Sequence, residues 1–141
     1  MSQITINEQT GDFTHVVKLT YADLANIGDG NQDTIAKIPA GGAVELVGVY
    51  ESVALAGASD ITFDIGTTAG DPDEFIDALD VDGMSAPVFN TGDAFTTGYT
   101  EAVGGTNSAA DVLLEVNGTV GDLTAGEVVI GIRMIDLGRF A

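Results

Sequence analysis

The chain has 141 residues, with 22 acidic and four basic side chains, a formal net charge of −18 and no cysteine. Its length corresponds to one domain, and the lack of cysteine excludes disulfides, thiolate metal sites and a cysteine nucleophile. The charge argues against nucleic acid and anionic membranes as partners, because proteins bind both through Lys and Arg.

The N-terminal sequence has neither the basic start nor the apolar stretch of a signal peptide, and apolar runs such as 128–132 are too short to span a bilayer. We therefore expect a protein made in a cytoplasm, with residues 1–141 forming a single domain. Residues 1–12 are interpreted either as an N-terminal arm that pairs with a neighbouring subunit or as an edge strand of the same chain.

Side chains that alternate between apolar and polar predict half-buried strands along most of the chain. In chain order the predicted strands cover 3–7, 13–21, 34–38, 43–55, 61–65, 86–90, 93–99, 111–117 and 127–136. Turn-forming clusters of Gly, Asp, Asn and Thr separate them. Short strands spaced by such turns, almost without helix, indicate an all-β protein: an antiparallel β-sandwich, jelly-roll-like in its connections.

The segment 43–55 (AVELVGVYESVAL) differs from the other predicted strands because it is apolar on both faces. Strict alternation gives the two faces the following residues: Val44, Leu46 and Tyr50 on one, and Val47, Val49 and Val53 on the other. Such a strand lies at the centre of a sheet, or its outer face meets a partner subunit.

One short helix is predicted near 72–79, within the acidic segment DPDEFIDALDVDG (71–83). Asp71 is a suitable N-cap, Pro72 suits the first helical position, and Glu74 completes a capping box. The apolar residues that follow have roughly helical spacing: Phe75, Ile76 and Leu79.

Three acids in the same segment are candidate calcium ligands: Asp77, Asp80 and Asp82. An EF-hand is excluded, because alignment on Asp80, Asp82 and Gly83 places Ala78 and Phe89 at its first and last ligand positions. A looser calcium site on the three acids stays open. The alternative is that they are solvated side chains without an ion, and no other cofactor is expected.

No motif for catalysis is present in the sequence. The only histidine, His15, alternates with Phe13 and Val17 on a predicted strand, which favours a packed or edge histidine over a catalytic one. No G-x-S-x-G elbow occurs. Aromatic residues make up 6 % of the chain and tryptophan is absent, so the usual platforms for sugar binding are missing. We therefore expect that the protein is not an enzyme.

Three stretches resemble the small head-decoration, or cement, proteins of tailed bacteriophages: KIPAGGAVELVGVYESVAL (37–55), DITFDIGTTAGDPDEFIDALDVDGM (60–84) and LEVNGTVGDLTAGEVVIGIRMI (114–135). The resemblance spans residues 34–137 and rests on turns and strand patterns. It implies a β-sandwich that binds the capsid exterior of a virion, contacts the major capsid protein and stabilises the shell. It also implies a homo-oligomer, with a trimer favoured, and it carries over no catalytic or contact residue.

A second class of function stays open, namely a calcium-dependent cell-surface or adhesion β-sandwich that acts as a binding module. Calcium separates the two classes. An adhesion module that uses the three acids would be stabilised by the ion, whereas a decoration protein of the kind described above needs none.

Overall fold

The computed structural model describes residues 2–5, 13–92 and 108–140. In chain order the elements are β1 (Ser2–Thr5), β2 (His15–Thr20), α1 (Tyr21–Ile27), β3 (Asn31–Ile38), β4 (Gly42–Ala56), β5 (Thr62–Gly66), β6 (Ile76–Asp80), β7 (Val88–Phe89), β8 (Ala110–Asn117), the 3-10 turn η2 (Val120–Asp122), β9 (Ala125–Asp136) and the 3-10 turn η3 (Gly138–Phe140). The predicted strand 93–99 and residues 6–12 of the predicted arm lie outside the described residues. No helix in the described part of the chain is long and apolar enough to cross a membrane.

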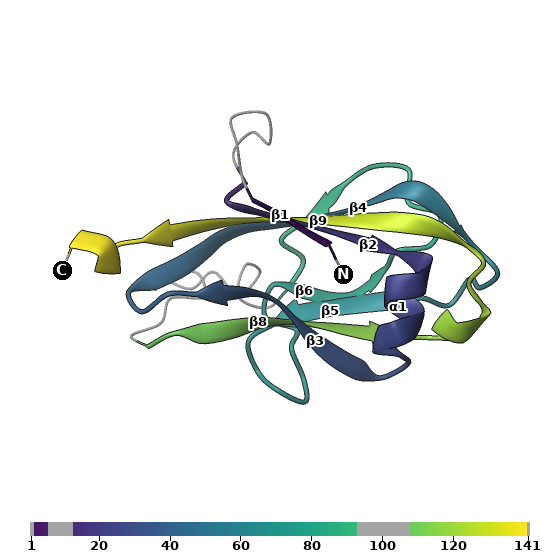
Figure 1. The fold of residues 1–141 in the computed structure, drawn as a ribbon, viewed down its shortest axis with the longest axis horizontal. Helices are drawn as coiled ribbons and strands as arrows, with labels where there is room; N and C mark the ends of the chain where they lie inside the picture. The colour runs from purple at the N-terminus through teal and green to yellow at the C-terminus, as the bar shows by residue number, and fades with distance from the viewer. Residues whose placement is uncertain (1, 6–12, 93–107, 141) are drawn as a thin grey trace.

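The strands form two antiparallel sheets that pack face to face (Figure 1). The five-stranded sheet has the order β1-β2-β9-β4-β7, and the four-stranded sheet has the order β3-β8-β5-β6. From β2 onwards the chain crosses between the sheets at almost every connection, and α1 forms the connection from β2 to β3 at one end of the molecule. The predicted antiparallel β-sandwich is confirmed.

The inner faces of the two sheets share one apolar core, which contains every second residue of the strands. Fully buried residues from β2, β5, β8 and β9 are Val17, Leu19, Phe63, Ile65, Val112, Leu114, Val116, Val128, Ile130 and Ile132. The residues between them point to the outer faces. Alternation in the sequence therefore identified these strands and the buried sides of these residues correctly. Phe13 was predicted on the side of Val17, but its ring lies over Gly131 on the outer face, so this part of the prediction was wrong.

The weaker strand predictions also have counterparts among the described residues. The predicted strand 34–38 lies within β3, and 86–90 contains the two-residue strand β7. β1 is an edge strand of the same chain, where Ser2 pairs with Lys18 and Thr5 with His15. The pairing of residues 2–5 is thus within the same chain, and the interpretation of residues 1–12 as an arm or an edge strand stays a prediction.

The helix lies at Tyr21–Ile27, so its predicted position near 72–79 was wrong. Thr20 caps it: the Asp23 N–H donates to Thr20 Oγ1 at 3.3 Å, and the Thr20 N–H donates to the Asp23 carboxylate at 2.9 Å. This reciprocal arrangement is a capping box that uses Asp as its acid. Gly28, with a φ of 86°, follows the last helical turn.

The acidic segment forms a strand instead of a helix, because Ile76–Asp80 is β6 and pairs with β5. Phe63 lies opposite Leu79 and Ile65 lies opposite Ile76, so three steps along β6 match two along β5. This mismatch is a β-bulge. It lets Ile76 and Leu79 both pack on the core although they are three residues apart, a spacing that resembles one face of a helix.

Glu74 does not form a capping box with Asp71. Its Oε2 accepts hydrogen bonds from Thr67 Oγ1 at 3.0 Å and from Thr68 Oγ1 at 2.7 Å, and both backbone N–H groups also donate to the carboxylate. Burial alone would raise the pKa of Glu74, but the hydrogen bonds from Thr68 and Thr67 outweigh this effect and lower it. The carboxylate therefore fixes the turn between β5 and β6.

β4 is an internal strand between β9 and β7, as its apolar sequence predicts, but its two faces differ from strict alternation. A β-bulge between Val44 and Leu46 turns Val44 toward the core together with Val47. Further irregularities follow Glu51, and Val53 is 53 % exposed instead of sharing the side of Val47. The predicted faces of Val44 and Val53 were therefore wrong.

Candidate functional site

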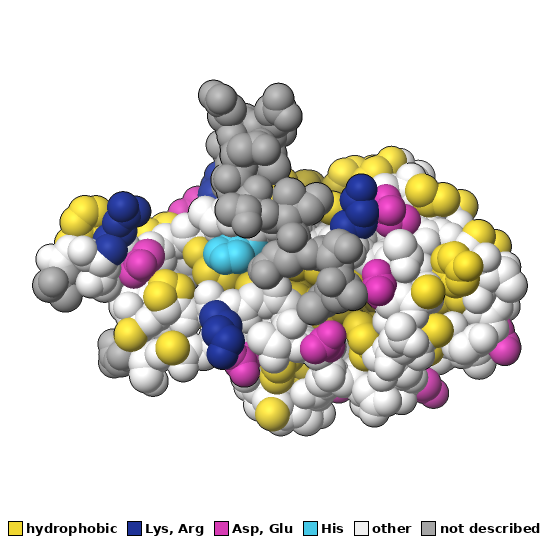
Figure 2. Space-filling view, in the orientation of Figure 1, with side chains coloured by type: hydrophobic (Ala, Val, Ile, Leu, Met, Phe, Trp, Pro, Cys, Tyr) yellow, Lys and Arg dark blue, Asp and Glu magenta, His cyan; other side chains and the backbone are white. Residues whose placement is uncertain are grey.

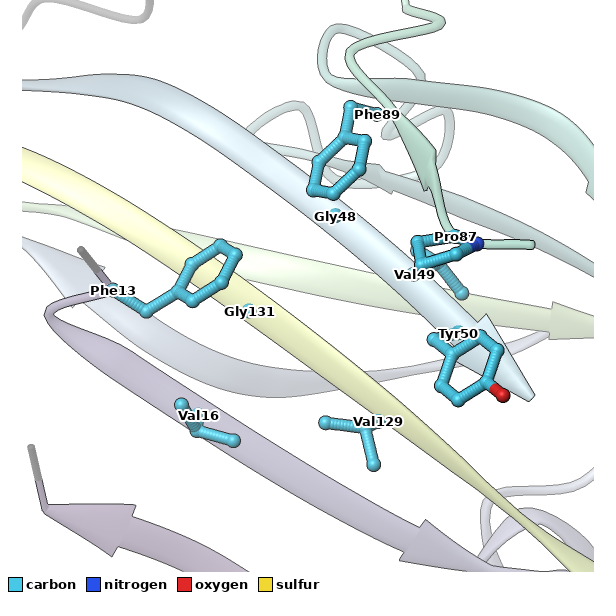
Figure 3. Close-up of a pocket in the computed structure, with 9 residues that line it drawn as sticks. All are labelled: Phe13, Val16, Gly48, Val49, Tyr50, Pro87, Phe89, Val129 and Gly131. Carbon is cyan, nitrogen blue, oxygen red and sulfur yellow. The ribbon is translucent and has the colours of Figure 1, made fainter. Parts of the chain in front are cut away.

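The outer face of the five-stranded sheet is built around two glycines. Gly48 of β4 lies opposite Gly131 of β9 within the long pairing of these strands. An aromatic ring covers each one: a Cβ on Gly48 would lie 2.5 Å from the Phe89 ring, and a Cβ on Gly131 would lie 2.7 Å from the Phe13 ring (Figure 3). Glycine at both positions lets the rings lie directly against the sheet.

The two rings border an apolar pocket of about 310 Å³. Its lining consists of Phe13, Val16, Gly48, Val49, Tyr50, Pro87, Phe89, Val129 and Gly131 (Figure 3). Tyr50 is 42 % exposed and Phe89 is 46 % exposed. A concave apolar surface that is open to solvent on a sheet face is typical of a contact site for another molecule.

Two ion pairs lie on the same outer face as the pocket. Lys18 Nζ lies 3.8 Å from Glu127 Oε1, and Arg133 Nη2 lies 2.5 Å from Glu45 Oε1. The strand register places Lys18 opposite the pocket residue Val129. Two of the four basic residues of the chain therefore compensate acids beside the pocket, although the net charge is −18.

The outer face of the four-stranded sheet has a different chemistry, because acids and amides form a network there. Gln32 Nε2 donates to Glu115 Oε2 at 2.8 Å, and Asn117 Nδ2 donates to both Glu115 and Asp64 at 3.2 Å. Burial raises the pKa of Asp64, and the negative charges of Glu115 and Asp77 add to this effect against a hydrogen bond from the Ala78 N–H. The two outer faces are thus clearly unlike each other.

The three candidate calcium ligands lie on and just after β6. Asp77 and Asp80 are exposed, and Asp80 Oδ1 accepts a hydrogen bond from the Asp82 N–H at 3.0 Å, as is typical of an Asp in a turn. Among the described residues, no three acidic or histidine side chains are placed to hold a metal ion. A calcium site on Asp77, Asp80 and Asp82 stays a prediction.

His15 is half-buried on β2, opposite Ile132 of β9. Its Nδ1 lies 3.1 Å from the Thr14 hydroxyl, and burial lowers the pKa of the imidazole. This arrangement agrees with the interpretation of His15 as a packed strand residue.

The pocket was missed at the level of the sequence, although a signal for it exists. A glycine inside a strand pattern marks a place where another group approaches the backbone closely. Gly48 and Gly131 are both such glycines, in the apolar runs VGVY and VIGI. Their pairing, and the rings that cover them, depend on the strand register and could not be read from local sequence.

Comparisons with known proteins place the fold. No family model matches the chain, and no curated protein matches it either. Among solved structures, the chain is similar to a chain of the cyanophage Pam1 capsid asymmetric unit, with a TM-score of 0.56 and 20 % sequence identity. The likeness covers 84 % of this chain and 79 % of that chain. The fold is one that a phage capsid contains.

Proposed function

We propose that the chain is a structural virion protein of a tailed phage, which binds the outer surface of the capsid and stabilises it without catalysing a reaction. The observation that supports this most directly is the fold shared with a chain of a phage capsid asymmetric unit, over 84 % of the length of this chain. The sequence resemblance of residues 34–137 to head-decoration proteins supports the same class of function.

The charge of the chain supports a position on the capsid exterior. A net charge of −18 repels DNA, which is packed inside a phage head, and it keeps a protein soluble at high concentration before assembly. A decoration protein needs both repulsion from DNA and high solubility, because it accumulates in an infected cell that contains much viral DNA.

The contrast between the two outer faces supports a protein with one contact face and one solvent face. The face with the pocket offers apolar surface, and the two ion pairs beside it neutralise acids that would otherwise repel another acidic surface. The opposite face has an acidic, hydrogen-bonded network that is better left in water. The proposed partners are the major capsid protein and further copies of this chain, with a trimer favoured.

Co-sedimentation with capsid shells tests this proposal. The probe is the empty, DNA-free shell formed by the major capsid protein of the phage whose genome encodes the chain. We expect saturable binding at a fixed number of chains per capsomer and a higher melting temperature of the decorated shell, because a ligand that binds only the assembled state stabilises it. Shells from an unrelated phage serve as the control.

The proposal fails if the chain stays in the supernatant with intact homologous shells at both low and high salt. Binding without any rise in the melting temperature of the shell would retain the capsid as partner but contradict the stabilising role.

A further inference from the structure

The C-terminal end of the described chain forms an exposed apolar tip, defined here as Ile135, Leu137, Arg139 and Phe140. Leu137 is 68 % exposed, Phe140 is 78 % exposed and Ile135 is 44 % exposed. η3 lies at one extreme end of the molecule, beyond the last strand pair of β9 (Figure 1). Figure 2 shows hydrophobic and basic side chains together at this end. Large apolar side chains gathered in this way on a projecting end are typical of a contact surface.

Backbone hydrogen bonds fix the position of the tip. The Leu137 N–H donates to Gly41 O at 3.1 Å, and the Phe140 N–H donates to Leu137 O at 3.1 Å. Gly41 and Gly138 lie against each other so closely that a Cβ on Gly41 would be 2.8 Å from Gly138 Cα. A fixed tip loses little conformational freedom when it binds, which favours its use as a contact.

The tip cannot fill the pocket of its own chain. β9 continues from Gly131, in the pocket floor, to its last pair between Asp136 and Gly42, and Gly138 follows two residues later. At the rise of an extended strand, the distance from Gly131 to Gly138 is about 20 Å. The pairing with β4 keeps β9 from folding back, so any tip that enters the pocket comes from another molecule.

The charge of the tip suits a second copy of the same chain. Arg139 is one of four basic residues against 22 acids in the chain, and its guanidinium lies 5.4 Å from the centre of the Phe140 ring. Two copies repel each other in most orientations because each carries a net charge of −18. The approach of the Arg139-bearing tip brings a positive charge toward a body of net charge −18, which lowers this repulsion.

We propose that the tip of one copy seats Leu137 and Phe140 in the pocket between Phe13, Tyr50 and Phe89 of a second copy. The contact joins two different surfaces of the same chain, so it is head-to-tail, and its repetition around the threefold axis of the favoured trimer closes a ring. The inference rests on the homo-oligomer of the proposed function and supplies the contact that forms it. Apolar surface is buried on both sides, and salt strengthens the association because it screens the repulsion between copies.

Two variants separate the two halves of this contact. The tip variant carries Leu137→Ser and Phe140→Ser, and the pocket variant carries Tyr50→Lys; all three positions are exposed, so the fold is expected to be retained. Matched controls make the same kinds of change at exposed residues that do not line the pocket: Tyr21→Lys, at 38 % exposure, and Val53→Ser, at 53 % exposure. Circular dichroism and a thermal melt confirm that each variant is folded.

Light scattering after size exclusion gives the decisive measurement. We expect the wild type and both controls to be oligomeric in about 1 M salt and to dissociate in part at about 0.1 M. Each variant alone is expected to be a monomer of 14.4 kDa. An equal mixture of the two is expected to form a species of twice that mass, because the intact tip of the pocket variant meets the intact pocket of the tip variant. The mixture is examined at higher concentration than the wild type, since one contact lacks the cooperativity of a closed ring.

Three results would overturn the inference: a wild type that is monomeric in all conditions, a tip variant that stays oligomeric, or a mixture that stays monomeric. Co-sedimentation of the same proteins with shells separates this inference from the proposed function. If the wild type is monomeric but binds shells, only the proposed head-to-tail contact is contradicted. If the wild type is oligomeric but does not bind shells, only the proposed capsid-binding role is contradicted.

Discussion

Gly48 and Gly131 lie opposite each other on β4 and β9, and each lies beneath one aromatic ring at the place where its own side chain would be. The pocket therefore owes its shape to two residues without side chains. A methyl group at either position has to displace the ring above it, and the ring is part of the pocket wall.

Gly48→Ala is expected to lower the free energy of unfolding by about 1–3 kcal/mol, because the added methyl group overpacks the contact with Phe89. Urea unfolding measures the change. In a Phe89→Ala background the same substitution is expected to be nearly neutral, since the ring is gone. Gly121→Ala, where no atom lies within 4 Å of the new Cβ, is the control. An equal loss in both backgrounds would show that the ring contact is not the cause.

Glu51 is expected to be important for stability, although it is an acid on an internal strand. It is 7 % exposed, and its two carboxylate oxygens accept hydrogen bonds from the Leu55 N–H at 2.8 Å and the Met84 N–H at 3.0 Å. Glu51→Ala leaves both donors without this partner, at a cost of about 1–3 kcal/mol for each donor that stays buried.

Glu51→Gln is expected to cost less than the alanine variant, because the amide keeps one acceptor oxygen. Asp122→Ala, at an exposed position, provides the control and is expected to change stability by less than about 0.5 kcal/mol. The account of Glu51 would be contradicted if Glu51→Ala were as mild as the control in chemical denaturation followed by circular dichroism.

Glu74→Gln is expected to destabilise the protein at neutral pH and to lose its effect in acid. The pKa of Glu74 is lowered in the folded state, so its carboxylate stabilises the fold above the ordinary value of 4.5, and this contribution disappears as the pH falls through the lowered pKa. Urea unfolding of variant and wild type between neutral pH and about pH 3 measures the difference. A difference that does not depend on pH would contradict the role of the charged form.

Asp64→Asn is expected to show the opposite trend, since burial and neighbouring acids raise the pKa of Asp64. The protonated form is favoured in the folded state, so the ionised carboxylate increasingly destabilises the wild type as the pH rises above the ordinary value of 3.8. The difference in stability between variant and wild type should therefore shift in favour of the variant between acid and neutral pH. A shift in the same direction as that of Glu74→Gln would contradict this expectation.

The calcium-dependent alternative makes its own prediction. If Asp77, Asp80 and Asp82 hold an ion, a chelator lowers the melting temperature and Asp80→Ala abolishes that sensitivity. The proposed capsid protein needs no ion and predicts the same melting curve with and without chelator. Differential scanning fluorimetry of wild type and Asp80→Ala, each with added calcium or chelator, distinguishes the two outcomes.

Strands with regular alternation could be predicted from the sequence because their pattern reflects burial directly. In β8, for example, Val112, Leu114 and Val116 are all buried, as their spacing requires. The errors arose where the backbone departs from regular pairing. The bulge in β6, opposite the step from Phe63 to Ile65, gives Ile76 and Leu79 a helix-like spacing. The bulge in β4 after Val44 changes which of its residues face the core.

Two segments of the chain carry the local signals of a helix start. Thr20 and Asp23 form the real capping box, but they follow a strand without a break, whereas Asp71 and Glu74 are preceded by a Gly-rich turn. The Glu74 carboxylate accepts hydrogen bonds from Thr67 and Thr68, which precede it in the turn. The capping-box spacing relates Glu74 only to Asp71 and does not predict these two partners. The pocket required knowledge of which glycines face each other, and register is a tertiary property.

The position of β9 has a consequence for the order in which the sheet is made. β9 lies between β2 and β4, and His15 pairs with Ile132, so the two earlier strands have no common neighbour until the last part of the described chain is synthesised. Pairings this far apart in sequence form slowly, and a ribosome needs on the order of ten seconds to add the intervening residues. During that interval the apolar sides of β2 and β4 lack the strand that will join them. The repulsion between acidic chains opposes the association of unfinished copies during this interval.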